Sequence, residues 1–185
     1  MNMNDLLEEN PVIAAVKDTE QLKQALKSNV GIIFVLFGDL MNIKELGDMI
    51  YESGKIGILH IDLVEGLSNK EVVIKFLKSE TKFNGIISTK PQMIKSAKNS
   101  ELLAIQRVFV YDSISFENVK KHILEESDAI EVLPGVMPKV INNLSSFSTK
   151  PIIAGGLIEN KEEVIQALSA GASCVSTSKK ENWSI

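Results

Sequence analysis

Four side chains that could hold a polar ligand interrupt short apolar runs of the sequence: His60, Asp62, Gln106 and Glu131. Side chains alternate between the two faces of an extended strand. We expect the apolar neighbours of these four residues to pack on one face, which places the four polar groups together on the other. Taking Ile105 as outward-facing puts Gln106 inside and leaves Arg107 on the opposite face, near the strand end.

Carboxylates accept hydrogen bonds from hydroxyl groups, and several inward ionisable groups are costly unless they meet partners or a polar ligand. The set therefore predicts a pocket for a hydroxylated molecule. Each residue also has a structural interpretation. His60 could be a hydrogen-bonded core histidine, Asp62 could cap a loop, and Glu131 could pair with a lysine.

Glycines and hydroxyl groups follow the last two apolar runs: Gly155, Gly156, Thr177 and Ser178. Glycine lets a ligand approach the backbone closely, and backbone N–H groups bind phosphate oxygens. These residues predict a phosphate site, although a plain strand-to-helix turn also tolerates glycine. Lys17 and Lys90, each just after a predicted strand, could offset the phosphate charge.

Eight apolar runs alternate with amphipathic helical segments. The predicted strands are Val12–Val16, Ile32–Phe37, Ile56–Leu63, Gly85–Ser88, Leu103–Val108, Ala129–Leu133, Ile152–Ala154 and Ser173–Thr177. Apolar strands separated by helices indicate a parallel sheet covered by helices, and eight such units indicate a (β/α)₈ TIM-type barrel. We expect one domain over residues 1–185. Only residues 178–185 remain for the eighth helix, which predicts a short or irregular last unit.

The composition argues against several classes of site. Cys174 is the single cysteine and lies in an apolar stretch, so neither a disulfide framework nor a thiolate metal site is expected. No second histidine accompanies His60 at a metal-ligand spacing. We expect no metal, no cofactor and no catalytic residue. Acid–base catalysis by Asp62 or Glu131 and a Schiff base on Lys90 remain chemical alternatives, which would suit a small phosphosugar isomerase, lyase or aldolase.

The formal net charge is −4, so no overall field attracts nucleic acid, and nothing resembles a signal peptide or a membrane span. A cytoplasmic protein without a membrane partner is expected. Residues 70–107 are locally basic, and the lysines that could form an RNA-binding stripe are Lys75, Lys78, Lys95 and Lys98. Solvation of two helix faces is the alternative interpretation.

Five segments, HIDLVEGL, NGIISTK, AIQRVFVYDS, IEVLPGVMPKVI and PIIAGGLI, together resemble the glycerol-3-phosphate-responsive antiterminator family. The resemblance runs in order from about Pro11 to Ser178. It implies a phosphate-binding barrel that binds glycerol 3-phosphate as effector and then the leader mRNA of the glycerol operon, letting transcription pass a terminator.

Carried onto this chain, the resemblance implies that Gly155, Gly156, Thr177 and Ser178 hold the phosphate. It places His60, Asp62, Gln106 and Glu131 in the effector pocket, where Lys17 is a further candidate. It supplies no RNA surface by motif, so the lysine stripe, with Lys179 and Lys180, is the candidate. The expected protein is a non-catalytic sensor. A barrel that signals to a protein partner is an alternative, and a homodimer formed through apolar positions of the last unit is a further hypothesis.

Overall fold

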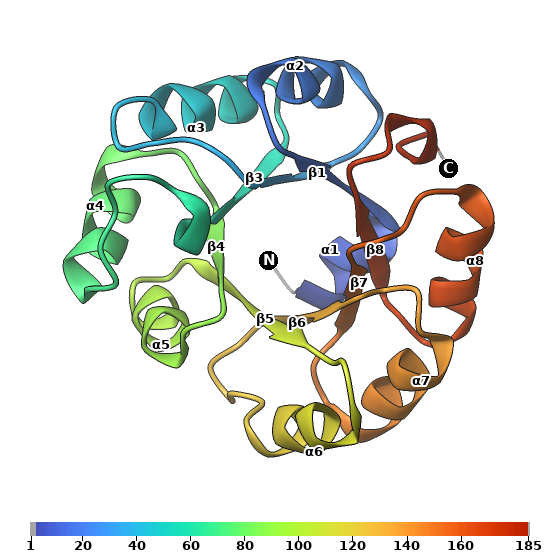
Figure 1. The fold of residues 1–185 in the computed structure, drawn as a ribbon. Helices are drawn as coiled ribbons and strands as arrows, with labels where there is room; N and C mark the ends of the chain where they lie inside the picture. The colour runs from blue at the N-terminus through green and yellow to red at the C-terminus, as the bar shows by residue number, and fades with distance from the viewer. Residues whose placement is uncertain (1–2, 185) are drawn as a thin grey trace.

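Eight parallel strands close into a barrel in the computed structural model, which describes residues 3–184 (Figure 1). The strands are β1 (Val12–Val16), β2 (Ile32–Val35), β3 (Ile56–His60), β4 (Gly85–Ser88), β5 (Leu103–Phe109), β6 (Ala129–Leu133), β7 (Ile152–Gly155) and β8 (Cys174–Thr177). They follow one another around the barrel in chain order, and β8 pairs with β1. The predicted (β/α)₈ barrel is confirmed.

The helices that follow the first strand surround the barrel and connect its strands, whereas the first helix precedes that strand. The helices are α1 (Met3–Glu9), α2 (Thr19–Lys27), α3 (Ile43–Glu52), α4 (Glu71–Glu80), α5 (Pro91–Asn99), α6 (Ser113–Lys121), α7 (Pro138–Phe147) and α8 (Lys161–Ser169). The side chains of Asp18, Asp112 and Asn160 accept hydrogen bonds from backbone N–H groups in the first turns of α2, α6 and α8. These caps satisfy amides that have no partner within a helix, and so fix where each helix begins.

The last unit is short, as the chain length predicts. Between β8 and residue 184, where the described part ends, the chain forms a single 3₁₀ turn, η2 (Lys180–Asn182). Trp183 closes it: the indole is buried in the protein's own core, and Nε1 donates to the Thr177 carbonyl at 2.9 Å. Trp183 therefore packs within its own chain, and the dimer hypothesis stays a prediction.

Two apolar layers stabilise the barrel. Alternate strand residues, such as Val12 and Ile33, pack outward against the helices, whereas Ile13, Phe34 and their equivalents fill the interior. Met3, Leu6 and Leu7 of α1 pack against this interior cluster. Figure 1 shows α1 behind the centre of the barrel, so it covers the amino-terminal end of the strands and leaves the carboxyl-terminal end as the accessible mouth.

Five of the eight strand ranges differ from the sequence prediction by one to three residues, and the side chains of one strand face the other way than expected. β2 ends at Val35, and β3 ends at His60, after which a 3₁₀ turn, η1 (Ile61–Leu63), turns the chain away. In β5, Ile105 lies in the interior cluster and Ala104 in the outer one. The prediction of which β5 side chains face inward is wrong, and Arg107 rather than Gln106 points into the barrel.

Candidate ligand-binding site

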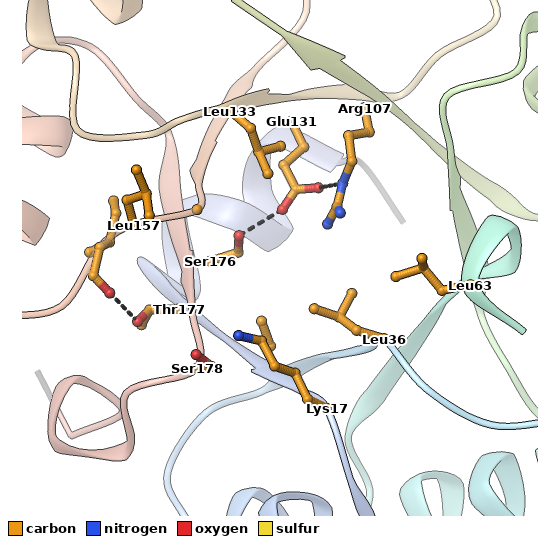
Figure 2. A pocket seen from close by; sticks show the side chains of 13 residues that line it. Lys17, Leu36, Leu63, Arg107, Glu131, Leu133, Leu157, Ser176, Thr177 and Ser178 are labelled. Atoms are coloured by element: carbon orange, nitrogen blue, oxygen red, sulfur yellow. Dashed lines mark hydrogen bonds and ion pairs between the residues drawn. The ribbon is translucent and has the colours of Figure 1, made fainter.

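A cavity of about 450 Å³ opens at the carboxyl ends of the strands (Figure 2). Residues from β1, β5, β6 and β8 line it, with residues from the loops that follow β2, β3, β7 and β8. They are Ala15, Lys17, Leu36, Leu63, Arg107, Glu131, Leu133, Gly156, Leu157, Ile158, Ser176, Thr177 and Ser178. A volume of this size is typical of small-molecule sites, and this end of a (β/α)₈ barrel is where such sites form.

One wall of the cavity is a hydrogen-bonded network on β5, β6 and β8. Glu131 is 1% exposed and accepts two bonds: Arg107 Nε donates to Oε2 and Ser176 Oγ donates to Oε1, both at 2.7 Å. The register pairs Arg107 directly with Glu131 on neighbouring strands. Figure 2 shows the terminal nitrogens of Arg107 pointing into the open centre of the pocket. The carboxylate is thus fixed in place, while part of the guanidinium faces the cavity.

Gly155 makes room for this network. A Cβ at this position would lie 2.6 Å from Glu131 Oε1 and 2.7 Å from Ser176 Oγ, closer than atoms that are not bonded approach each other. A side chain at position 155 would therefore push the buried carboxylate out of place. Gly155 itself is absent from the cavity lining, so its role in the structure is to accommodate Glu131.

The adjoining wall is the loop after β7 together with the end of β8. Gly156 has a φ of +78° and the following Leu157 a φ of +61°, both in the left-handed region. Such a conformation is strained for leucine and is characteristic of functional loops. Gly156 and Ser178 both line the cavity. Among residues 3–184, no backbone hydrogen bond outside the pairing of the strands has the N–H group of either residue as its donor.

Lys17 and Arg107 are the two cationic side chains that line this cavity. Figure 2 shows the amino group of Lys17 directed toward the side of the pocket that holds Ser176 and Ser178. Among the described residues, no carboxylate forms a salt bridge with Lys17, in contrast to Arg107. The cavity therefore has a cation without a salt bridge on the side of β1 and Ser178, and a paired carboxylate and guanidinium on the side of β5 and β6.

The sequence was then compared with known proteins. Residues 12–183 match the family described as "Glycerol-3-phosphate responsive antiterminator". The chain belongs to this family. It is 44% identical over 186 residues to "Uncharacterized protein YgcP" of Escherichia coli K12, covering 100% of this chain and 97% of that protein.

Two solved structures of glycerol uptake operon antiterminator proteins are similar to this antiterminator-family barrel. The regulatory protein from Listeria monocytogenes has a TM-score of 0.86 at 35% identity, covering 93% of this chain and 94% of its own. The related protein from Thermotoga maritima has a TM-score of 0.83 at 31% identity, covering 94% and 98%. A decarboxylase and two aldolases, each 14% identical, are similar in fold alone.

Some sequence-predicted site residues of this family member lie elsewhere. Gln106 lies on the outer face of β5, where Nε2 donates to the His122 carbonyl at 2.9 Å and Oε1 accepts from Leu124 N–H at 2.9 Å. Its expected place in the pocket is wrong. The amide instead binds the backbone that follows α6, which ties this segment to the barrel. Apolar residues occupy both faces of β5, so hydrophobicity alone could not assign its orientation.

Asp62 stands outside the cavity lining, in η1, and binds the start of the loop after β4. It accepts from Ser88 Oγ and from Thr89 N–H at 2.8 Å, and from Thr89 Oγ1 at 2.9 Å. Burial raises the pKa of Asp62, but these hydrogen bonds and the nearby Lys90 outweigh it and hold the pKa below its usual value. Asp62 therefore caps a loop, which is the structural interpretation that the sequence had left open. Lys90 Nζ lies 3.6 Å from Asp62 and also donates to Asn69, away from the cavity lining.

His60 lies on the same face of β3 as Ile58, inside the barrel, and is 3% exposed. It is not part of the cavity lining, and its Nδ1 is buried without a hydrogen-bond partner among the described residues. Burial and the positive charge of Arg107 lower its pKa from 6.5 to about 4. The imidazole is therefore neutral near pH 7.

This lowered pKa predicts a loss of stability in mild acid. The unfolded chain binds a proton on His60 below pH 6.5 whereas the folded chain does not, so stability falls as pH drops from about 6.5 toward 4. Between about pH 7.5 and pH 5 the loss from this residue should be about 2 kcal/mol. Urea unfolding of wild type and His60→Gln at both pH values measures it. Equal losses in the two proteins would contradict the assignment.

The four lysines of the expected RNA stripe all have partners. Lys75 pairs with Glu71 at 2.9 Å, Lys95 with Glu126 at 3.5 Å, and Lys98 with Asp128. Lys78 Nζ donates to the Glu101 carbonyl at 3.2 Å. Three of the four charges are thus partly compensated by carboxylates, which the basic sequence between residues 70 and 107 did not reveal.

The described residues were also searched for a metal site and for a membrane-spanning helix. Among residues 3–184, no three His, Cys, Asp or Glu side chains cluster as a metal site would need. In the same range, no helix is both long and apolar enough to cross a membrane.

Arg107 and four leucines of the cavity were not among the sequence candidates. Arg107 could have been found by aligning β5 with β6, which sets it beside Glu131.

Proposed function

We propose that this protein binds glycerol 3-phosphate in the mouth of its barrel and that the effector-bound form binds the leader mRNA of a glycerol operon as a transcription antiterminator. The observation that carries the proposal is the asymmetry of the cavity. Lys17 and the backbone amides of Gly156 and Ser178 gather where an anion fits, and Glu131 with Arg107 lies on the other side. Membership of the family supports the same effector.

The phosphate end of the effector is assigned to the loops after β7 and β8. Backbone N–H groups that point into a concave loop bind phosphate oxygens, and an unpaired ammonium adds charge. Thr177 contributes indirectly, because its hydroxyl donates to the Ile158 carbonyl at 2.8 Å and accepts from Lys179 N–H at 3.1 Å. Its role is to hold the two loops together, with Ser178 as the contact to phosphate.

A sensor rather than an enzyme is the function that these residues support. Glu131 has hydrogen bonds at both carboxylate oxygens, which fits binding better than proton transfer. Burial, with the charge of Glu131, raises the pKa of the Cys174 thiol well above its usual range, so this residue is no thiolate nucleophile. Binding then acts by shifting the rim loops toward an RNA-competent arrangement, which requires higher effector affinity in that state.

The lysine stripe on α4 and α5 stays our candidate for the RNA surface. The side chains of Lys75, Lys95 and Lys98 are 68%, 53% and 49% exposed. Exposed ion pairs of this kind contribute about 1 kcal/mol or less, so RNA phosphates can displace the carboxylates.

The deciding experiment is a titration of the glycerol-operon leader RNA with the purified protein, with and without glycerol 3-phosphate, at two salt concentrations. Affinity should rise with the effector and fall with salt, because phosphate contacts release counterions. RNA affinity is plotted as its logarithm against the logarithm of salt concentration. Replacing Lys75, Lys78, Lys95 and Lys98 with glutamine should make the slope of this line shallower by roughly 3. Glutamine at the exposed Lys23 and Lys27 of α2, which removes two charges away from the stripe, is the control. If the effector binds but RNA binds in neither condition, the antiterminator function is contradicted.

A further inference from the structure

The Arg107–Glu131 pair places hydrogen-bond donors and an acceptor side by side on one wall of the cavity. Only Nε of Arg107 is bound to Glu131, and the terminal nitrogens point into the pocket (Figure 2). Each oxygen of Glu131 accepts one hydrogen bond and has capacity for a second. The side chain of Arg107 is 11% exposed and that of Glu131 1%, so water competes little for either.

Adjacent hydroxyl groups match this arrangement. Each hydroxyl donates one hydrogen bond and accepts others, so a vicinal diol can donate to a carboxylate while it accepts from a guanidinium. A phosphate dianion only accepts, and the carboxylate of Glu131 repels it. The phosphate is therefore favoured at Lys17, where no carboxylate forms a salt bridge among the described residues.

We propose that Arg107 and Glu131 bind the two free hydroxyl groups of the effector, and that this pair selects a short phosphorylated vicinal diol over other small phosphates. The inference rests on the proposed binding of glycerol 3-phosphate and specifies how the same site discriminates. Ser176 and Gly155 are positioning residues, since one donates to Glu131 and the other leaves room for it.

The rest of the lining limits the length of the polyol. Glu131 is the only carboxylate among the lining residues, and the remaining side chains near it and at the rim are largely apolar: Leu36, Leu63, Leu133 and Leu157. A tetritol or pentitol phosphate would place its additional hydroxyls against these leucines, where they would lose hydrogen bonds to water without replacement. The site thus favours a three-carbon ligand.

Calorimetric titration with four probes tests the selection: glycerol 3-phosphate, dihydroxyacetone phosphate, n-propyl phosphate and inorganic phosphate. Dihydroxyacetone phosphate has a ketone in place of the central hydroxyl, and n-propyl phosphate lacks both hydroxyls. Wild type should bind glycerol 3-phosphate roughly 100-fold more tightly than n-propyl phosphate, with the ketone in between. Equal affinity for glycerol 3-phosphate and n-propyl phosphate overturns the inference but leaves the proposed function standing. Binding of none of the four contradicts the proposed function itself.

The variant Glu131→Gln separates hydroxyl recognition from a structural role. It keeps the size of the side chain but loses the charge, so affinity for glycerol 3-phosphate should fall toward that for n-propyl phosphate, whose own affinity should not weaken. A fall for both ligands by the same factor would mean that the residue only maintains the fold, and would overturn the inference. Ser176→Ala should show the same selective effect more weakly. If Glu131→Gln does not fold, the wild-type probe series and Ser176→Ala still decide the question.

Discussion

Replacing Lys17 with glutamate should weaken the binding of glycerol 3-phosphate by roughly 100-fold, which is about 2.7 kcal/mol. Lys17 lines the cavity, forms no salt bridge among residues 3–184, and points toward the loop that carries Ser178. A phosphate bound there would lose an attractive charge and gain a repulsive one. Lys17 is an exposed residue at the mouth of the cavity, so added salt should weaken this contact.

The matched control for this charge reversal is Lys23→Glu. Lys23 belongs to α2, the helix that follows Lys17, and is exposed to solvent. The control changes the net charge by the same amount, so both variants alter the overall field equally. Calorimetric titration of the three proteins gives the comparison. If Lys17→Glu and Lys23→Glu bind the effector equally well, the phosphate does not lie beside Lys17.

Replacing Gly155 with alanine should lower the free energy of unfolding by about 3 kcal/mol. The added Cβ would lie 2.6 Å from Glu131 Oε1 and 2.7 Å from Ser176 Oγ, which are hydrogen-bonded to each other. Both groups are buried, so neither can move into solvent to relieve the clash. The carboxylate would shift away from Ser176 and lose that hydrogen bond in an environment with little water.

Two further variants separate the causes of this loss. Ser176→Ala removes the same hydrogen bond without a clash and should cost about 1 kcal/mol. Gly54→Ala places a Cβ in open space at a φ of +76°, so it measures left-handed strain alone, at about 1 kcal/mol. Guanidinium unfolding of all three proteins provides the comparison. A cost of Gly155→Ala no larger than that of the other two would contradict a steric role for this glycine.

The glycine pair illustrates how far sequence reasoning reaches. Two adjacent glycines after a predicted strand suggest close approach of a ligand, and Gly156 does line the cavity with a left-handed backbone. Gly155 is required for a different reason, which is the buried carboxylate of Glu131 on the neighbouring strand. No local pattern reveals this reason, because residues 131 and 155 meet only when β6 and β7 pair.

The question of which face of a strand points into the barrel shows the same limit of sequence reasoning. The alternation in Ala129–Leu133 placed Glu131 inside correctly, because Ile130 and Val132 both require an apolar outer face. In Leu103–Phe109, apolar residues lie on both faces, and the sequence prediction chose the wrong one. The interior of a barrel this small is itself filled with apolar side chains, so a strand buried on both faces carries little alternation.

From the sequence by itself followed the eight βα units, the closed barrel with its shortened last unit, the family, and the orientation of Glu131. These follow from hydrophobic periodicity, turn residues and long motifs, all of which are local along the chain. Only the tertiary structure decided that Arg107 pairs with Glu131, that Asp62 caps a loop, and that Gln106 lies outside. Those contacts join residues 16 to 27 positions apart, and the strand register and the loop geometry at the barrel rim determine which side chains can meet.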